Sequence, residues 1–207
     1  MSLTQSLAAF RTGMAQASNM VSAAHRLDAA GQSLFSAAER EVITVAALLH
    51  SFKAWEGFLE VAFSKYLIGR LSIDGRRPKK FAKPKDLASA QSMIIGVMKY
   101  FDYANHENVK RMSKIYFQNG EPFDNNLSAI TTDLSDLRVM RNSAAHISST
   151  TQAALEALAQ RLFTVPQPNI TLYDLLLRID PTSPTGETIF ASYQRKLDVT
   201  AELIAKA

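Results

Sequence analysis

The stretch from residue 36 to residue 68 constrains the fold most, because its apolar side chains recur at steps of four and three. This spacing places them on one face of a helix and predicts a long helix from about Ser36 to Ile68, with Gly69 as its stop. The apolar positions are Leu48, Phe52, Trp55, Leu59, Ala62 and Tyr66. Such a face must be covered by other helices, and the step pattern favours helices packed nearly antiparallel in a bundle.

The rest of the chain is divided by proline and glycine into further helical segments, and no alternating strand of useful length is present. We expect helices at about 2–27, 86–101, 107–117, 126–145, 149–163, 171–179 and 187–205. Asp86 is expected to cap its helix, and Ser149 to Gln152 has capping-box spacing. The predicted fold class is therefore all-α, a helical bundle forming a single domain over residues 1–207.

Composition narrows the function classes. The chain has 207 residues, of which 47% are hydrophobic, so it can bury a sizeable core. It contains no Cys, which excludes disulfides, a thiol nucleophile and Cys-based metal sites. The four His residues are scattered without metal-ligand spacing, so no metal site is expected. We also expect no membrane partner, since no apolar run is long enough to span a bilayer, and a cytoplasmic location, since the N-terminus lacks a signal-like pattern.

A strongly basic segment follows the long helix. Residues 76–85 hold six of the 23 Lys and Arg residues and no acid, and two prolines rule out a regular helix there. One interpretation is a loop that binds an RNA backbone, with Phe81 free to stack on a base. The other is a solvated linker between two helices. The predicted RNA-binding residues are Arg76, Arg77, Lys79 and Lys80.

The segment from Arg141 to His146 closes the helix expected at 126–145. The apolar rhythm of that helix runs through Leu127, Ile130, Leu134 and Leu137. Arg141 is the next position in this apolar spacing, so a charged side chain is expected on the buried face, where its burial is costly. A charged residue at a position that the spacing reserves for an apolar one tends to mark a functional site. Asn142 and His146 are four residues apart and share the adjoining face. The alternative is a structural ion pair for Arg141 and a helix-capping role for His146.

An Arg, a polar residue directly after it and a His shortly downstream resemble the signature of the HEPN superfamily, helical domains of toxins, abortive-infection systems and RNA-processing proteins. Arg141, Asn142 and His146 match these three positions. The stretch 46–60, which contains Glu56, is similar to the early helix of the family. Among subfamilies the sequence resembles the RiboL-PSP HEPN group, which genomic context links to RNA repair. The resemblance covers about residues 36–165, so the helices at 2–27 and 171–206 would be additions to a bundle of HEPN type.

The resemblance implies a metal-independent endoribonuclease, in which the 2′-hydroxyl of RNA attacks the adjacent phosphorus and the 5′-oxygen leaves. His146 would act as general base or acid, because imidazole titrates near neutral pH. Arg141 would stabilise charge on the phosphoryl oxygens, and Asn142 would orient the phosphate or His146. Glu56 would belong to the same site, although a surface carboxylate paired with Lys53 is the other interpretation. No metal and no organic cofactor is implied.

The resemblance also implies partners. RNA would be the substrate, and two protomers would place their motifs together at the seam of a homodimer, because one His cannot easily serve as both base and acid. An antitoxin or a neighbouring defence or repair protein would be a further partner. Two other classes remain open from the residues: a non-catalytic HEPN-like module that binds RNA or protein, and a helical structural or regulatory protein without a nucleic-acid role.

Overall fold

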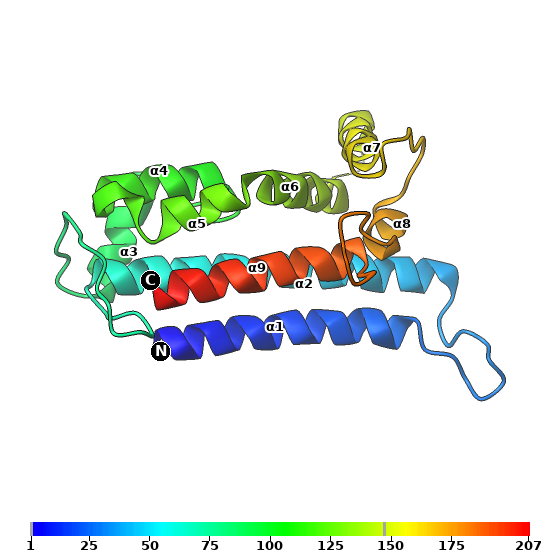
Figure 1. Cartoon of the computed structure of the whole chain (residues 1–207), viewed down its shortest axis with the longest axis horizontal. Coiled ribbons are helices and arrows are strands. Elements are labelled where there is room, and N and C mark those ends of the chain that lie inside the picture. The colour runs from blue at the N-terminus through cyan, green and yellow to red at the C-terminus, as the bar shows by residue number, and fades with distance from the viewer. Residues whose placement is uncertain (1, 147) are drawn as a thin grey trace. The chain divides into compact units, whose positions relative to one another are not determined.

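The computed structural model describes residues 2–146 and 148–207, and the regular structure in these ranges is entirely helical (Figure 1). Only isolated bridges, such as Lys80 with Phe117, have strand-like pairing in the described ranges. The long helices are α1 (Leu3–Ala24), α2 (Ala37–Leu67), α6 (Thr131–Ala145), α7 (Ser149–Phe163) and α9 (Ile189–Lys206). The shorter ones are α3 (Leu87–Ile95), α4 (His106–Tyr116), the 3-10 turn η1 (Gln118–Gly120), α5 (Phe123–Ala129) and α8 (Leu172–Leu177). The predicted all-α class is confirmed.

The chain divides into two compact units, each built from separated segments. Unit 1 comprises Met1–Arg11, Ala54–Leu134 and Leu197–Ala207, and unit 2 comprises Thr12–Lys53 and Ser135–Lys196. Helices α1, α2, α6 and α9 therefore contribute residues to both units. The expectation of a single domain stays a prediction, and the two units are described separately.

Aromatic side chains form the core of unit 1. Phe63 stacks on Phe123 with ring centroids 4.8 Å apart, and its edge meets Phe117 at 5.2 Å. The hydroxyl of the fully buried Tyr66 donates a 2.6 Å hydrogen bond to the carbonyl oxygen of Ile204. Burial also raises the pKa of this hydroxyl far above its ordinary value. The last segment of the chain is thus tied into a core that begins on α2.

Polar cross-links join the helices of unit 2. The side-chain amide of Gln194 on α9 donates to the hydroxyl of Ser51 on α2 at 2.9 Å and to the carbonyl oxygen of Met14 on α1 at 3.2 Å. Ser36 and Glu39 start α2 with a reciprocal capping box, which satisfies amide groups that the helix itself leaves free. These contacts join α1, α2 and α9 within unit 2.

The structure corrects two predicted helix boundaries in unit 1. Asp86 caps α3 as expected, with its carboxylate accepting from the Ser89 amide at 2.7 Å. However, α3 ends at Ile95 rather than near residue 101, because Gly96 has a positive φ of 60° that stops the helix. The helix expected at 126–145 is two helices, α5 and α6, interrupted at Ile130.

The start of α7 lies one residue earlier than the predicted capping box. Ser148, not Ser149, is the N-cap, and its hydroxyl accepts from the amide of Thr151 at 3.2 Å. The hydroxyl of Thr151 accepts in return from the amide of Ser148 at 3.1 Å. A Thr hydroxyl therefore takes the role that the sequence pattern assigned to Gln152.

Helix α2 is the one helix of the described ranges that is long and apolar enough to cross a membrane by length and composition. Its best 18-residue window has a mean hydropathy of 1.2, and 44% of that window is buried inside the protein. The sequence expectation of no membrane-spanning run and no membrane partner stays a prediction, because this criterion uses length and composition alone. Core helices of soluble proteins pass the same test, so the finding does not assign a membrane partner.

Candidate functional site

The C-terminal turn of α6 in unit 2 carries the Arg–Asn–His motif. Arg141 and Asn142 are both half-buried, and the Arg141 guanidinium donates a long 3.4 Å hydrogen bond to the amide oxygen of Asn142. Within residues 2–146 and 148–207, no carboxylate lies at ion-pair distance from Arg141. Its positive charge is thus available to an external anion. The structural ion pair considered from the sequence is absent from the described residues.

Met140, one position before Arg141, continues the buried apolar face of α6. Leu134, Leu137 and Met140 are the buried apolar residues of this helix. Met140 is fully buried, and Arg141 lies next to it at the edge of the buried stripe. The expectation that Arg141 occupies a core slot is therefore corrected: it is a boundary residue, where a charge costs less than in the interior.

His146 directly follows α6 and is exposed. Its backbone amide donates to the carbonyl oxygen of Asn142 at 2.9 Å, and its own carbonyl oxygen accepts from the Thr151 hydroxyl at 2.7 Å. The Ser143 hydroxyl adds a bond to the Thr151 carbonyl oxygen at 3.3 Å. The backbone at His146 is therefore held between α6 and α7, while its imidazole has no hydrogen-bond partner among the described residues. Sequence reasoning missed Ser143 and Thr151.

A cavity of about 530 Å³ in unit 2 lies beside His146, and we name it the motif cavity. Val42, Val45 and Leu49 of α2 form its apolar wall, whereas Ser143 and Thr151 contribute hydroxyl groups. Val42 is 68% exposed, so part of this wall faces solvent. Neither Arg141 nor any Lys lines the cavity. The imidazole and the guanidinium are thus near each other along the helix but do not line one hollow.

A buried charge supports α6 one turn and a half before the motif. Asp136 is 7% exposed and accepts a 2.6 Å hydrogen bond from the Tyr193 hydroxyl of α9. The guanidinium of Arg161 on α7 pairs with the same carboxylate at 2.5 Å. This pairing also raises the pKa of Arg161. Asp136 therefore links three helices of unit 2 and fixes the direction of α6.

Glu56 belongs to unit 1, where it is half-buried on α2, whereas the motif belongs to unit 2. It is engaged in an interaction of its own, so it is not a free carboxylate. Its predicted role beside Arg141 stays a prediction.

The basic segment of unit 1 is a loop pinned to the turn after α4. The amide of Phe81 donates to the Tyr116 carbonyl oxygen, and the amide of Gln118 donates to the Lys79 carbonyl oxygen, both at 2.9 Å. Arg76, Arg77 and Lys79 line a cavity of about 560 Å³, whose opposite wall includes Gln118, Asn119 and Asn125. We name it the basic pocket. Phe81 is 69% exposed and therefore open to stacking.

Lys80 differs from its basic neighbours because its ammonium group points back into the protein. It donates a hydrogen bond to the carbonyl oxygen of Leu67, at the end of α2. Partial burial lowers the pKa of Lys80, and the positive charges of Arg77 and Lys83 lower it further. Lys80 does not line the basic pocket. The structure thus places three of the four predicted RNA-binding residues together and gives Lys80 a capping role.

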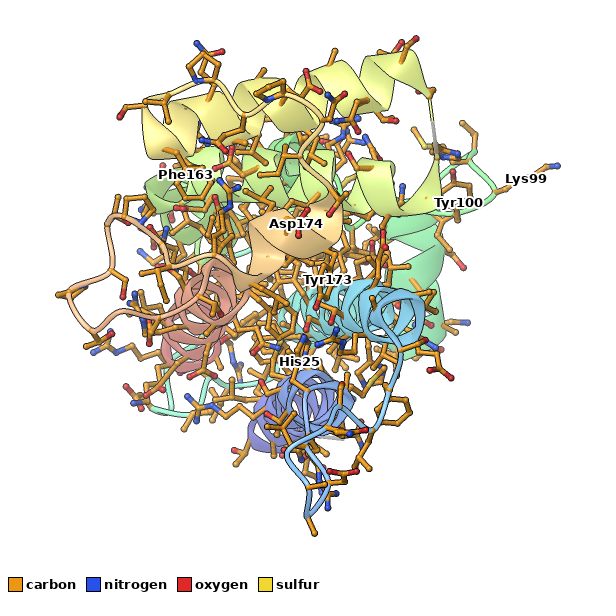
Figure 2. All side chains as sticks on the ribbon, turned by 90° about the vertical axis from the view of Figure 1, so that its right-hand side faces the viewer. His25, Lys99, Tyr100, Phe163, Tyr173 and Asp174 are labelled. Atoms are coloured by element: carbon orange, nitrogen blue, oxygen red, sulfur yellow. The ribbon has the colours of Figure 1, made fainter. Side chains whose placement is uncertain are left out.

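The other three His residues all have contacts within the protein. His25, directly after α1, stacks on Tyr173 of α8, with 3.0 Å between its Nε2 and the Tyr173 hydroxyl (Figure 2). His50 lies 3.1 Å from the amide oxygen of Gln16, and His106 is buried beside Glu107. Within residues 2–146 and 148–207, no three His, Asp or Glu side chains gather as a metal-binding group.

Comparisons with protein-family models, with curated proteins and with solved structures found no match to this chain.

Proposed function

We propose that this protein is a metal-independent endoribonuclease of HEPN type. The observation that carries the proposal is the end of α6, where a half-buried Arg141 without an acidic partner in the described ranges precedes an exposed His146. A guanidinium that no carboxylate neutralises is a ready ligand for a phosphate. An imidazole on an anchored backbone is a ready proton carrier.

The proposed reaction uses the RNA's own hydroxyl as nucleophile. A base removes the proton of the 2′-hydroxyl, its oxygen attacks the adjacent phosphorus, and the bond to the 5′-oxygen breaks. The products are a 2′,3′-cyclic phosphate and a 5′-hydroxyl, and the leaving oxygen takes a proton from an acid. His146 would serve as base or acid, Arg141 would stabilise charge on the phosphoryl oxygens, and Asn142 would orient the phosphate. The His of a second protomer would supply the other proton transfer, so the proposal includes a homodimer.

The biological setting that we propose is a toxin, a phage-defence system or RNA repair, in keeping with the resemblance to HEPN domains and to the RiboL-PSP group. An antitoxin or a defence or repair protein encoded nearby would be a partner, and the reaction would take place in the cytoplasm. Growth arrest on expression, relieved by His146→Ala, would support a toxin.

A second candidate is a module that binds RNA or protein without cleaving it. The motif cavity favours this alternative, because no Lys or Arg among the described residues lines the hollow beside His146. In that case Arg141 would hold a phosphate and His146 would transfer no proton.

Cleavage of a labelled RNA in EDTA tests the proposal. The wild type should cleave, and Arg141→Ala and His146→Ala should each lose most activity. Arg138→Ala and His50→Ala are matched controls, because Arg138 is exposed one turn earlier on α6 and His50 is another His of unit 2. Both controls should keep activity. Circular dichroism would verify that all four variants fold.

Two results would contradict the nuclease. One is cleavage that persists in both motif variants, and the other is cleavage that appears only with magnesium. Binding of RNA without any cleavage, weakened by Arg141→Ala but not by His146→Ala, would favour the non-catalytic module instead.

A further inference from the structure

We infer that the basic pocket of unit 1 binds one nucleotide, with its phosphate against the cations of the loop and its base against the amides of the opposite wall. The inference is independent of the nuclease proposal, because the residues involved belong to the other unit and include no His. It rests on how the loop is held, on its charge and on the side chains that face it.

The loop is organised before any ligand arrives. Besides the two bonds to the turn after α4, the Ser72 amide donates to the Arg76 carbonyl oxygen at 2.7 Å, and the Arg76 amide donates to the Ser72 hydroxyl at 3.0 Å. Lys80 fixes the centre of the loop on α2 through the Leu67 carbonyl oxygen. A pre-organised loop loses less conformational entropy on binding than a free one, so more of the interaction energy remains for affinity.

The cations of the pocket are not neutralised within the protein. In the part of the chain that the structure describes, Arg76, Arg77 and Lys79 form no ion pair. Glu121 is the one acidic side chain of the lining, against these three cations. Two guanidinium groups can each donate two parallel hydrogen bonds to a phosphate, and the ammonium adds a third charge. The pocket therefore selects an anion with several oxygens.

The opposite wall indicates that the ligand is more than a bare phosphate. The side-chain amides of Gln118, Asn119 and Asn125 make no hydrogen bond with the described residues, whereas Asn126 already donates to the Pro122 carbonyl oxygen at 2.6 Å. Each free amide offers both a donor and an acceptor. The edge of a nucleobase presents the matching mixture, and Asn and Gln pair with adenine in this way. The carboxylate of Glu121 suits ribose hydroxyls, as acidic residues do in other nucleotide sites.

The size of the pocket agrees with such a ligand. Its volume of about 560 Å³ lies within the usual range of small-molecule sites, roughly 300–1,000 Å³. Inorganic phosphate would fill a small part of it and would leave the amide wall unused. A free nucleotide and a nucleotide unit of single-stranded RNA offer the same phosphate and base, so the experiment has to separate these two sources.

Titration of the full-length protein with three probes tests the inference: 5′-AMP, inorganic phosphate and a fluorescent 2′-O-methyl RNA of adenines. None of them can be cleaved through a 2′-hydroxyl, so the result does not depend on nuclease activity. 5′-AMP should bind more tightly than phosphate. Lys79→Ala should weaken its binding about tenfold, as expected for loss of one hydrogen bond to a charged group. For the RNA it should also reduce the slope of affinity against salt by roughly 0.7.

Lys85→Ala is the matched control, because it removes the same charge from the same loop at an exposed residue that does not line the pocket. Asn125→Ala, compared with Asn19→Ala on the exposed side of α1, tests the amide wall. Binding of 5′-AMP that is weakened by Lys79→Ala and Asn125→Ala but not by the controls would support a free nucleotide as ligand. The same pattern seen only with RNA would support a nucleotide unit of RNA. Equal losses for Lys79→Ala and Lys85→Ala, or equal affinity for phosphate and 5′-AMP, would overturn the inference.

Discussion

The basic pocket of unit 1 and the motif of unit 2 offer a ligand opposite kinds of chemistry. The basic pocket gathers three cations and a wall of amides, but its lining contains no His. The motif has a single cation at the helix edge and an exposed imidazole beside a largely apolar cavity. The first arrangement suits tight binding of an anion, whereas the second suits proton transfer with little binding strength of its own. Under our two proposals, the chain would bind a ligand in the basic pocket and catalyse a reaction at the motif.

The largest effect that would distinguish the motif from the basic pocket is expected on the turnover number for RNA cleavage. His146→Ala should lower kcat for RNA cleavage by about 100-fold or more, the usual contribution of a general acid or base. Lys79→Ala should raise KM and leave kcat nearly unchanged, because a contact with a phosphate that does not react is equally strong in the ground state and the transition state. Steady-state kinetics in EDTA measure both. A similar loss of kcat in the two variants would contradict the assignment of catalysis to the motif and of ligand binding to the basic pocket.

The next effect concerns the support of α6. Asp136→Ala should lower the free energy of unfolding by about 1.5–3 kcal/mol, because the Tyr193 hydroxyl and Arg161 lose a charged acceptor. The side chain of Arg161 is 48% exposed, against 10% for Asp136, so Arg161→Ala should cost less. Urea unfolding of both variants gives the two values. If Arg161→Ala lowered the free energy of unfolding more than Asp136→Ala, the Asp136 carboxylate would not be the group on which the Tyr193 and Arg161 contacts depend.

Two adjacent lysines of the basic loop provide a smaller, more selective test. Lys80→Met should lower the free energy of unfolding by about 0.5–1.5 kcal/mol, since the Leu67 carbonyl oxygen loses its donor. Its affinity for 5′-AMP should fall less than that of Lys79→Met, because Lys80 orders the loop but does not line the pocket. Lys79→Met should do the reverse, weakening nucleotide binding at unchanged stability. Thermal unfolding and calorimetric titration of both proteins separate these effects, and a loss of affinity in Lys80→Met as large as in Lys79→Met would assign Lys80 to the pocket.

The smallest effects are expected at the two helix starts that follow the sites. Ser148→Ala at α7 should lower the free energy of unfolding by about 0.5–1 kcal/mol at every pH, because a hydroxyl cap does not titrate. Asp86→Ala at α3 should destabilise the protein at neutral pH but progressively less in acid. Hydrogen bonds from Ser89 hold the pKa of Asp86 below its usual range, so its carboxylate stabilises the fold above the ordinary aspartate pKa. That contribution is lost as the pH falls through the lowered pKa. Urea unfolding at several pH values should therefore show the wild type and Asp86→Ala converging in acid.

Local rules predicted much of this fold. The apolar steps along α2 place its ends within a residue of those observed, and Asp86 caps α3 as its type and position suggest. The predictions of helix boundaries failed where two alternative local structures fit the same sequence pattern. The break at Ile130 leaves the apolar rhythm intact, so a helix with and without the break gives the same sequence pattern. Ser148 and Ser149 are chemically identical caps, and only the reach of the Thr151 hydroxyl decides between them.

The candidate sites were predictable as residue types but not as arrangements. The sequence shows six cations in the basic segment, yet nothing in it says that Lys80 turns inward to the end of α2 while Lys79 faces a cavity. The amides of Gln118, Asn119 and Asn125 carry no motif, and the pinned loop alone brings them opposite the cations. For the motif, the residues were evident, but the lack of an acidic partner for Arg141 within the described ranges required the structure.

The segmented make-up of unit 1 has a consequence for how the chain is made in the cell. Tyr66 and Ile204, joined by a buried hydrogen bond, are 138 residues apart in the sequence. A ribosome must therefore produce everything between them before the core around Tyr66 can close. Until then the part of α2 around Tyr66 lacks its contact with the last helix, although Phe10, Phe117 and Phe123 can already pack on other parts of α2. Between the synthesis of α2 and the synthesis of the last helix, this part of the core is therefore incomplete and exposed to chaperones or to aggregation.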